Sequence, residues 1–137
     1  MAYWLMKSDP ETYSYADLER DKKTVWDGVS NNLALKHLRS MKRGDQVLIY
    51  HSGNEKALVG IAEIVSAPYP DPKKNNPKLV VVEVVPKGRL VRPISLSEIK
   101  LKRKWKDFEL LRMPRLSVMP VTEAVWVGLL KMTRPTS

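Results

Sequence analysis

The sequence predicts an α+β domain, in which short helices surround a curved mixed sheet or small barrel. Three observations support this fold class. Runs of β-branched and aromatic residues, typical of strands, alternate with short amphipathic segments. Capping signals precede several of these segments, as expected at helix starts. No repeat or low-complexity stretch divides the chain, so its 137 residues are expected to form one domain, residues 1–137.

The first elements are short. Residues 2–6 form an apolar run and are expected to open the sheet as a strand. A Ser-x-x-Asp tetrad that begins at Ser14 resembles a capping box, and it predicts a helix over residues 15–20. The following residues, 24–26, contain too few positions for a secondary-structure prediction.

The next helix is expected to begin at one of two adjacent asparagines and to end near Met41. Both Asn31 and Asn32 have a side chain that can cap a helix, and we assign the cap to Asn32. The apolar stripe of this helix leaves Lys36 and Arg39 together on another face.

The middle of the chain predicts three strands. Residues 46–51 and 57–65 are apolar runs separated by a turn, and Gly60 inside the second predicts a bulge or a close backbone approach. Residues 67–77 contain four prolines and are expected to form a loop, whereas residues 79–85 are expected to form a buried strand.

The last third of the chain predicts helices. Ser95 begins a full Ser-x-x-Glu capping box for a short helix, and residues 107–112 are expected to form another. Thr122 is expected to cap a final helix that runs to about Met132.

Composition excludes several function classes. The chain contains no cysteine, which excludes disulfides, thiolate metal sites and thiol catalysis, and its two histidines are too few for a histidine-rich metal site. It has neither an apolar run long enough to span a membrane nor a signal peptide, so we expect a soluble, cytoplasmic protein without a membrane partner. The formal charge of +9 favours a polyanionic partner, and nucleic acid is the commonest of these.

The residues from Trp26 to Asn32 are the most informative segment for function. Trp26 offers a flat aromatic surface on which a heterocycle can stack, and Asn31 and Asn32 can both donate and accept hydrogen bonds at the edge of a base. A buried tryptophan followed by a turn and a helix cap would have the same sequence. Of the two amides, Asn31 can contact a base edge or cap the helix.

A catalytic interpretation has to use His51, with Ser52 as nucleophile or with Asp45 or Asp71 as partner. Adjacent residues of a strand point to opposite faces, which argues against a direct pair between His51 and Ser52. No nucleophile elbow, phosphate-binding glycine loop or metal-spaced ligand set is present in the sequence. We therefore expect no catalytic residues, no metal and no cofactor.

Several segments together form one recognisable pattern. In order, they are Tyr3-Trp4-Leu5-Met6-Lys7-Ser8-Asp9-Pro10, Trp26-Asp27-Gly28-Val29-Ser30-Asn31, Tyr50-His51-Ser52, Val59-Gly60-Ile61-Ala62-Glu63, Tyr69-Pro70-Asp71-Pro72 and Arg115-Leu116-Ser117-Val118. Over residues 2–130 the chain closely resembles the EVE domain family. This resemblance implies a PUA-like fold, similar to that of YTH and ASCH domains, and a protein that reads modified bases, modified cytosines in DNA included, without being an enzyme.

The residue types and their positions, together with the resemblance, indicate expected roles for individual residues. The base-binding set is expected to be Ser8, Trp26, Asn31, Tyr50, His51, Ser52, Leu116 and Ser117. The phosphate-binding set is expected to be Lys7, Lys36, Arg39 and Arg115. Trp4 and Trp126 are expected to lie in the core.

The expected partner is DNA or RNA that contains a modified cytosine or adenine, bound by a protein that we expect to be a monomer. Two alternatives stay open: a general PUA-type RNA-binding protein, and an enzyme that acts on a modified nucleotide through His51. The chain departs from the family pattern at Ser30, where arginine is usual, at Asn32, where an aromatic is usual, and mildly at Asp9. The segment 73–78 is also shorter than in many relatives.

Overall fold

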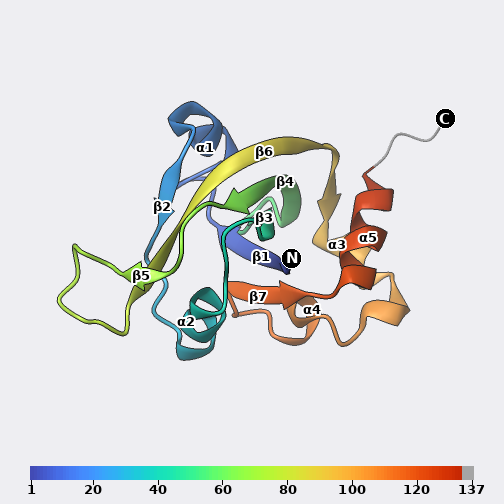
Figure 1. Cartoon of the computed structure of the whole chain (residues 1–137). Coiled ribbons are helices and arrows are strands. Elements are labelled where there is room, and N and C mark those ends of the chain that lie inside the picture. Colours follow the sequence, from blue (N-terminus) through green and yellow to red (C-terminus); the bar gives the residue numbers. More distant parts are fainter. Residues whose placement is uncertain (134–137) are drawn as a thin grey trace.

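The structure is a computed structural model in which residues 1–133 are described. One strongly curled sheet forms its centre, with short helices at the edges and ends of the sheet (Figure 1). The strands are β1 (Tyr3–Ser8), β2 (Thr24–Trp26), β3 (Gln46–His51), β4 (Ala57–Ile64), β5 (Tyr69–Pro70), β6 (Val80–Ser95) and β7 (Val118–Val121). The helices are α1 (Tyr15–Asp21), α2 (Asn32–Arg39), α3 (Leu96–Lys100), the 3-10 turn η1 (Arg103–Trp105), α4 (Glu109–Arg112) and α5 (Glu123–Met132).

The sheet is mixed, as the sequence predicts. The strands follow the order β2-β6-β4-β3-β1-β7, and β5 pairs with β6 beside this path. The β1–β3 pair is parallel, with Leu5 opposite Leu48, and the other pairs are antiparallel. The sheet curls strongly enough to bring the edge strand β2 close to the end of β1, although three strands separate them in the sheet order. The predicted α+β fold, a curved mixed sheet surrounded by short helices, is confirmed.

The capping predictions are mostly confirmed. Ser14 and Ser95 each form the reciprocal hydrogen bonds of a capping box, and Thr122 caps α5. The prediction for the second helix is wrong in one detail: Asn31, and not Asn32, is the cap, and its side-chain oxygen accepts a hydrogen bond from the amide of Ala34 at 3.0 Å. The same helix ends at Arg39, earlier than expected.

Three strand features differ from the sequence-based expectation. The strand expected over residues 79–85 continues as β6 to Ser95, because shifts of register against β4 let it bend and keep pairing past the exposed residues 87–89. The loop over residues 67–77 contains the short strand β5. Strand β7 was not predicted, since Pro120 interrupts its apolar run, and as an edge strand it tolerates that proline.

Gly60 lies against Tyr15, which confirms the expected close approach. A Cβ atom at Gly60 would lie 2.5 Å from the Tyr15 ring, so only glycine fits beneath that ring. The Tyr15 hydroxyl donates to the carbonyl of Ile61 at 2.7 Å and accepts from the amide of Gly88 at 3.0 Å. This contact fastens α1 across the bulged part of the β4–β6 pair and fixes where the chain enters β2.

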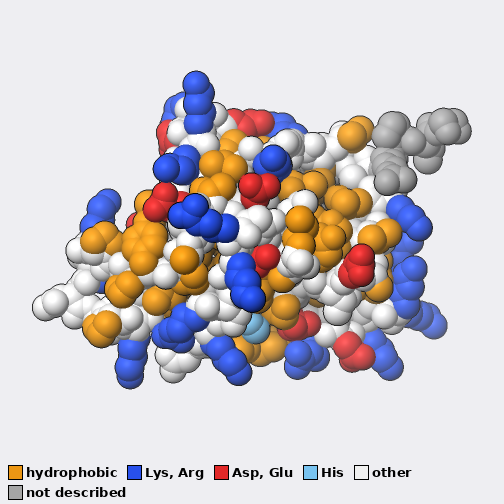
Figure 2. Space-filling view, in the orientation of Figure 1, with side chains coloured by type: hydrophobic (Ala, Val, Ile, Leu, Met, Phe, Trp, Pro, Cys, Tyr) orange, Lys and Arg blue, Asp and Glu red, His pale blue; other side chains and the backbone are white. Residues whose placement is uncertain are grey.

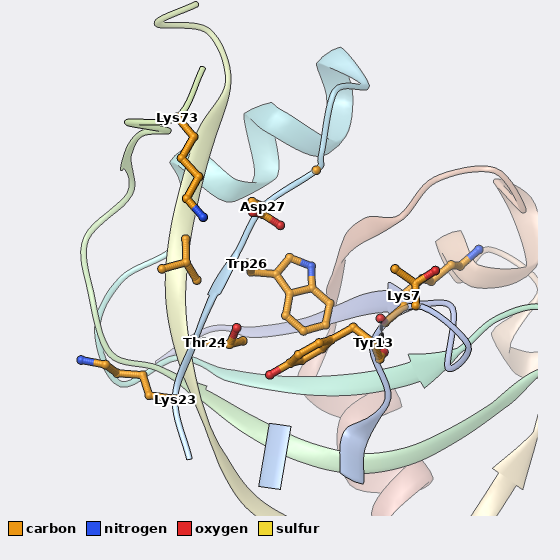
Figure 3. Close-up of a pocket in the computed structure, with 11 residues that line it drawn as sticks. Lys7, Tyr13, Lys23, Thr24, Trp26, Asp27 and Lys73 are labelled. Atoms are coloured by element: carbon orange, nitrogen blue, oxygen red, sulfur yellow. Dashed lines mark hydrogen bonds between the residues drawn. The ribbon is translucent and has the colours of Figure 1, made fainter. Parts of the chain in front are cut away.

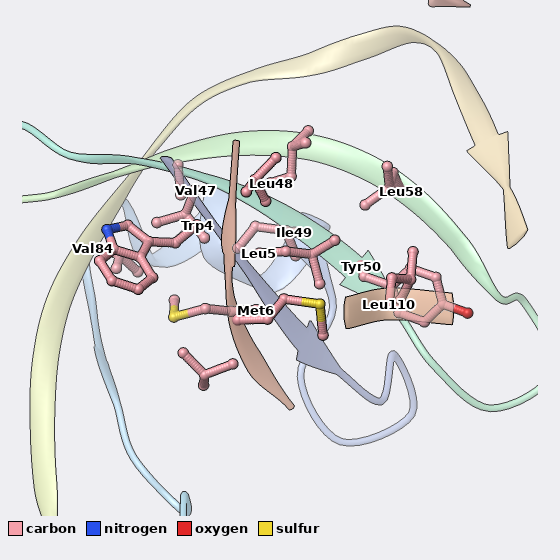
Figure 4. Close-up of a cluster of buried hydrophobic side chains, with 14 of the residues drawn as sticks. Trp4, Leu5, Met6, Val47, Leu48, Ile49, Tyr50, Leu58, Val84 and Leu110 are labelled. Atoms are coloured by element: carbon pink, nitrogen blue, oxygen red, sulfur yellow. The ribbon is translucent and has the colours of Figure 1, made fainter. Parts of the chain in front are cut away.

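The core lies inside the curl of the sheet. Figure 4 shows side chains from β1, β3 and neighbouring strands packed into one cluster, which includes the fully buried Leu5, Leu48 and Leu58. Trp4 and Trp126 are buried, as expected, and Trp126 stacks on Tyr3 with ring centroids 4.4 Å apart.

A buried carboxylate joins the start of β1 to the turn before β3. Asp45 accepts hydrogen bonds from the Trp4 indole N–H at 3.0 Å and from the amides of Ala2 and Lys42 at 3.1 and 3.0 Å. Burial acts to raise the pKa of this carboxyl group, but the three hydrogen bonds outweigh it and hold the pKa below its ordinary value.

Over residues 1–133, no helix is both long and apolar enough to cross a membrane.

Candidate functional site

A cleft of about 600 Å³ opens where the end of β1, the turn after it and strand β2 converge (Figure 3). Its wall combines one indole, one phenol, three ammonium groups and one carboxylate with small polar side chains. The lining residues are Lys7, Ser8, Thr12, Tyr13, Lys23, Thr24, Val25, Trp26, Asp27, Gly28 and Lys73. The cleft therefore depends on the curl of the sheet, because β1 and β2 are not neighbours in it.

Trp26 is the central aromatic residue of the cleft. It ends β2, where it pairs with Val82 of β6, and 8% of its surface is exposed. Tyr13 meets the ring edge-on, with centroids 6.5 Å apart and planes at 89°. The indole N–H of Trp26 has no acceptor among the described residues, yet none of their buried polar side-chain atoms lacks a partner, so this N–H is accessible from the cleft.

The turn that carries Tyr13 is fixed by local hydrogen bonds. The amide of Tyr13 donates to the carbonyl of Asp9 at 2.8 Å, and the Ser8 hydroxyl donates to the carbonyl of Tyr13. At the other end of the side chain, the Tyr13 hydroxyl donates to Asp21 at 2.9 Å. Burial raises the pKa of Tyr13 above its ordinary value, and the neighbouring Asp21 carboxylate adds to this rise, so the phenol stays a hydrogen-bond donor.

Three lysines surround the cleft, and two of them are engaged within the protein. Lys7 is half-buried, and its ammonium donates to the carbonyl of Pro114 at 2.8 Å and lies 5.6 Å from the centroid of the Tyr50 ring. Burial lowers the pKa of Lys7. Lys23 pairs with Glu83 at 3.3 Å. The ammonium of Lys73 has no hydrogen-bond or ion-pair partner among residues 1–133 and is available for a ligand.

The wider surface is suited to an anionic ligand. Figure 2 shows lysine and arginine side chains spread over the visible face, with apolar areas between them. Together with the formal charge of +9, this distribution attracts polyanions and supports contact with a phosphate backbone. No cluster of metal-ligating side chains occurs in the described part of the chain.

Of the residues predicted for the site, the structure brings only Ser8, Trp26 and Lys7 to the cleft. Asn31 does not line it, since its side-chain oxygen caps α2. Tyr50 is 4% exposed and packs beneath Lys7 instead of facing the cleft. Both residues have structural contacts in this arrangement, and their predicted contact with the base stays a prediction.

His51 and Ser52 are also placed differently from the prediction. The His51 Nε2 atom accepts a hydrogen bond from the amide of Tyr15 at 3.0 Å, so the ring carries its proton on Nδ1, which donates to Glu55. Nε2 thus joins β3 to the start of α1, Nδ1 is engaged in the turn between β3 and β4, and His51 does not line the cleft. The amide of Ser52 donates to the carbonyl of Ser8 at 3.0 Å, which extends the β1–β3 pairing.

The remaining predicted residues lie outside the cleft. Leu116 is buried in the core, and the carbonyl of Ser117 accepts from the amide of Lys7 at 2.9 Å. Arg115 and Lys36 are exposed on other parts of the surface. The guanidinium of Arg39 donates to the carbonyl of Lys78 at 3.0 Å, so it fastens α2 to the loop before β6.

Sequence reasoning missed four important residues of the cleft: Tyr13, Lys23, Asp27 and Lys73. Asp27 belongs to the tryptophan segment, but the sequence pattern gives it no role of its own. Lys73 lies in a proline-rich loop, and its approach to β2 depends on β6 pairing with β2. No periodic pattern in the sequence reports such an approach.

Comparison with known proteins identifies the family. The sequence pattern of the EVE domain matches residues 2–132. The chain belongs to the EVE domain family. This EVE domain is 35% identical to thymocyte nuclear protein 1 of Rattus norvegicus, in an alignment that covers 88% of this chain and 69% of the relative. It is 33% identical to the Homo sapiens protein, with 89% and 69% covered.

Solved structures agree with this assignment. The EVE domain superimposes on protein Rpa0253 from Rhodopseudomonas palustris with a TM-score of 0.92 and 38% identity, covering 97% of this chain and 93% of the other. Human THYN1 protein, in complex with 5-methylcytosine-containing DNA, gives a TM-score of 0.91 and 30% identity over the whole of both chains. An ASCH protein from Zymomonas mobilis, 12% identical with a TM-score of 0.64, shares the fold.

Proposed function

We propose that this EVE domain binds DNA that contains a modified base, with a modified cytosine as the first candidate, and that it receives this base in the Trp26 cleft. The human THYN1 protein, which has the same fold at 30% identity, is known in complex with DNA that contains 5-methylcytosine. The observation that carries the proposal for this chain is the placement of Trp26 in a cleft surrounded by lysines.

The cleft has the features that an extruded base requires. A base stacked on an aromatic side chain gains about 1–3 kcal/mol, and extrusion from a duplex costs a few kcal/mol, so the two are of similar size. The phosphates on either side of the base then supply the remaining attraction through the basic surface.

The size of a methyl group limits how selective the domain can be. One added methyl in a fitted apolar site changes binding by about 1–3 kcal/mol, or roughly 10–200-fold. We therefore propose a preference for the modified base over the unmodified one, with measurable binding of both.

The proposed function is binding without chemistry. The Ser8 hydroxyl donates to a backbone carbonyl and not to a side chain that could act as a general base and activate it. No histidine lines the cleft. His51 is engaged through both ring nitrogens. These contacts support a binding site over a nucleophile activated by a neighbouring base.

A binding screen at fixed salt tests this function. We expect duplex DNA with a single 5-methylcytosine to bind more tightly than the same duplex with cytosine, by about 10-fold or more. Single-stranded RNA of the same sequence and other modified bases form the rest of the panel. Equal affinity for all members, with a steep dependence on salt, would contradict the proposal and would favour the general RNA-binding alternative.

Lys73 is expected to contact a phosphate. Replacing it with glutamine should weaken binding to modified and unmodified DNA by the same factor and reduce the slope of log affinity against log salt by about 1. Titrations at several salt concentrations measure this slope. Lys131→Gln, on the exposed face of α5 and outside the cleft lining, is the matched control and should leave both quantities unchanged. A base-dependent effect of Lys73→Gln would instead assign this lysine to the base.

A further inference from the structure

We propose that Asp27 makes the cleft select bases that carry an exocyclic amino group and reject bases of the same shape that carry a carbonyl oxygen there. This inference rests on the proposed function, since it concerns the base held against Trp26. It assigns to Asp27 the discrimination between 5-methylcytosine and thymine, which share the 5-methyl group.

Asp27 is chemically exceptional in the cleft. It is the single carboxylate among the lining residues, which otherwise carry neutral groups and the ammonium groups of Lys7, Lys23 and Lys73. Its side chain is exposed and has no hydrogen bond or ion pair with any residue in the range 1–133. Asp45 accepts three hydrogen bonds that stabilise the fold, whereas Asp27 accepts none among the described residues.

The backbone fixes this carboxylate beside the aromatic surface. Asp27 directly follows Trp26 at the end of β2, and the chain then turns at Gly28, whose φ of +80° lies in the left-handed region that favours glycine. In Figure 3 the Asp27 side chain lies beyond the five-membered ring of the indole, and Tyr13 lies near its six-membered ring. A base stacked on Trp26 would thus present one edge to Asp27.

A carboxylate is unfavourable in a site for a polyanion unless it receives a hydrogen bond. Its charge repels the phosphates that the surrounding lysines attract. An ionised carboxylate can only accept hydrogen bonds, so a donor on the base is needed to offset this repulsion. The exocyclic amino group of cytosine is such a donor, and Asp or Glu that accepts from cytosine N4 is a known mode of base recognition.

Thymine presents the opposite chemistry at the same position. Its O4 atom is an acceptor, so thymine placed as 5-methylcytosine would bring two acceptors together and leave the carboxylate without its donor. A site built around a hydrogen bond rejects an analogue that lacks the partner much more strongly than an apolar site rejects a missing methyl group. Trp26 would thus provide affinity for any base, whereas Asp27 would provide the choice among them.

The test compares two oligonucleotides that differ only in 5-methylcytosine or thymine, each placed opposite the same abasic site so that base pairing does not contribute. We expect the wild-type protein to bind the 5-methylcytosine oligonucleotide about 10-fold more tightly or better. Asp27→Asn should bring the ratio of the two dissociation constants close to 1, because an amide can donate to O4 as well as accept. The thymine oligonucleotide should bind the variant more tightly than the wild type.

The control is Asp107→Asn, which removes an exposed carboxylate outside this cleft and should keep the wild-type ratio. Thermal unfolding of both variants checks that the fold is intact. A wild-type ratio near 1, or a ratio that survives Asp27→Asn, would overturn the role of Asp27 while leaving the proposed function standing. If a folded Trp26→Leu variant bound both oligonucleotides as tightly as the wild type, the proposed function itself would be overturned.

Discussion

Removal of the Trp26 ring is expected to abolish the selective binding of 5-methylcytosine DNA. Stacking on an aromatic ring contributes about 1–3 kcal/mol per base, so its loss should weaken binding roughly 5–150-fold. Only the electrostatic attraction of the basic surface would remain, with a similar affinity for modified and unmodified DNA. Fluorescence anisotropy with labelled duplexes at fixed salt measures both effects.

The choice of variant matters because Trp26 also pairs with Val82 in the sheet and meets the Tyr13 ring edge-on. Trp26 is 8% exposed, and a tryptophan-to-alanine change at a buried position costs about 3–5 kcal/mol of unfolding free energy. Trp26→Leu keeps part of the apolar volume without an aromatic surface, and Trp26→Phe keeps a smaller aromatic surface. We expect the leucine variant to lose selective binding and the phenylalanine variant to retain part of it. If both variants are folded and both select 5-methylcytosine DNA as strongly as the wild type, the stacking role is contradicted.

Asp45→Ala is expected to destabilise the fold strongly. It leaves the buried Trp4 indole N–H without its acceptor, which costs about 1–3 kcal/mol, and it removes two partly buried hydrogen bonds from backbone amides, each worth about 0.5–1.5 kcal/mol net. We expect a loss of roughly 3–5 kcal/mol in the free energy of unfolding, measured by urea denaturation at neutral pH. A loss below about 1 kcal/mol would mean that these hydrogen bonds contribute little net stability.

The same carboxylate predicts an acid dependence of stability. The pKa of Asp45 is lower in the folded than in the unfolded chain, where it is about 3.9. Its stabilising contribution is therefore complete above the unfolded pKa and is lost as the pH falls through the folded value. Asp45→Asn removes the titration, so the stability difference between wild type and this variant should shrink below about pH 4. A constant difference across that range would contradict the assignment.

Local features of the fold were predictable because local chemistry determines them. Ser14, Ser95 and Thr122 begin helices through hydrogen bonds within four residues, and these signals are visible in the sequence. The extent of β6 and the presence of β7 were not predictable in the same way. Both depend on pairing with strands distant in sequence, which overrides an exposed stretch in one and a proline in the other.

Part of the site was predictable from the family resemblance. Trp26, Ser8 and Lys7 belong to segments that resemble the family, and they do line the cleft. The side chain of Asn31 serves α2, although the sequence could not decide between a cap and a ligand contact. Lys73 joins the cleft because β6, which follows its loop, pairs with β2, and sequence spacing carries no sign of that pairing.

The indole N–H signal of Trp26 in a ¹H–¹⁵N NMR titration tests the central claim most directly. Trp26→Phe assigns the signal by its disappearance, and the buried Trp4 and Trp126 serve as internal references. Addition of a duplex with one 5-methylcytosine is expected to shift the Trp26 signal strongly and to leave those of Trp4 and Trp126 almost unchanged. Binding of the duplex with an unmoved Trp26 signal would show that the base is held elsewhere and would contradict the account.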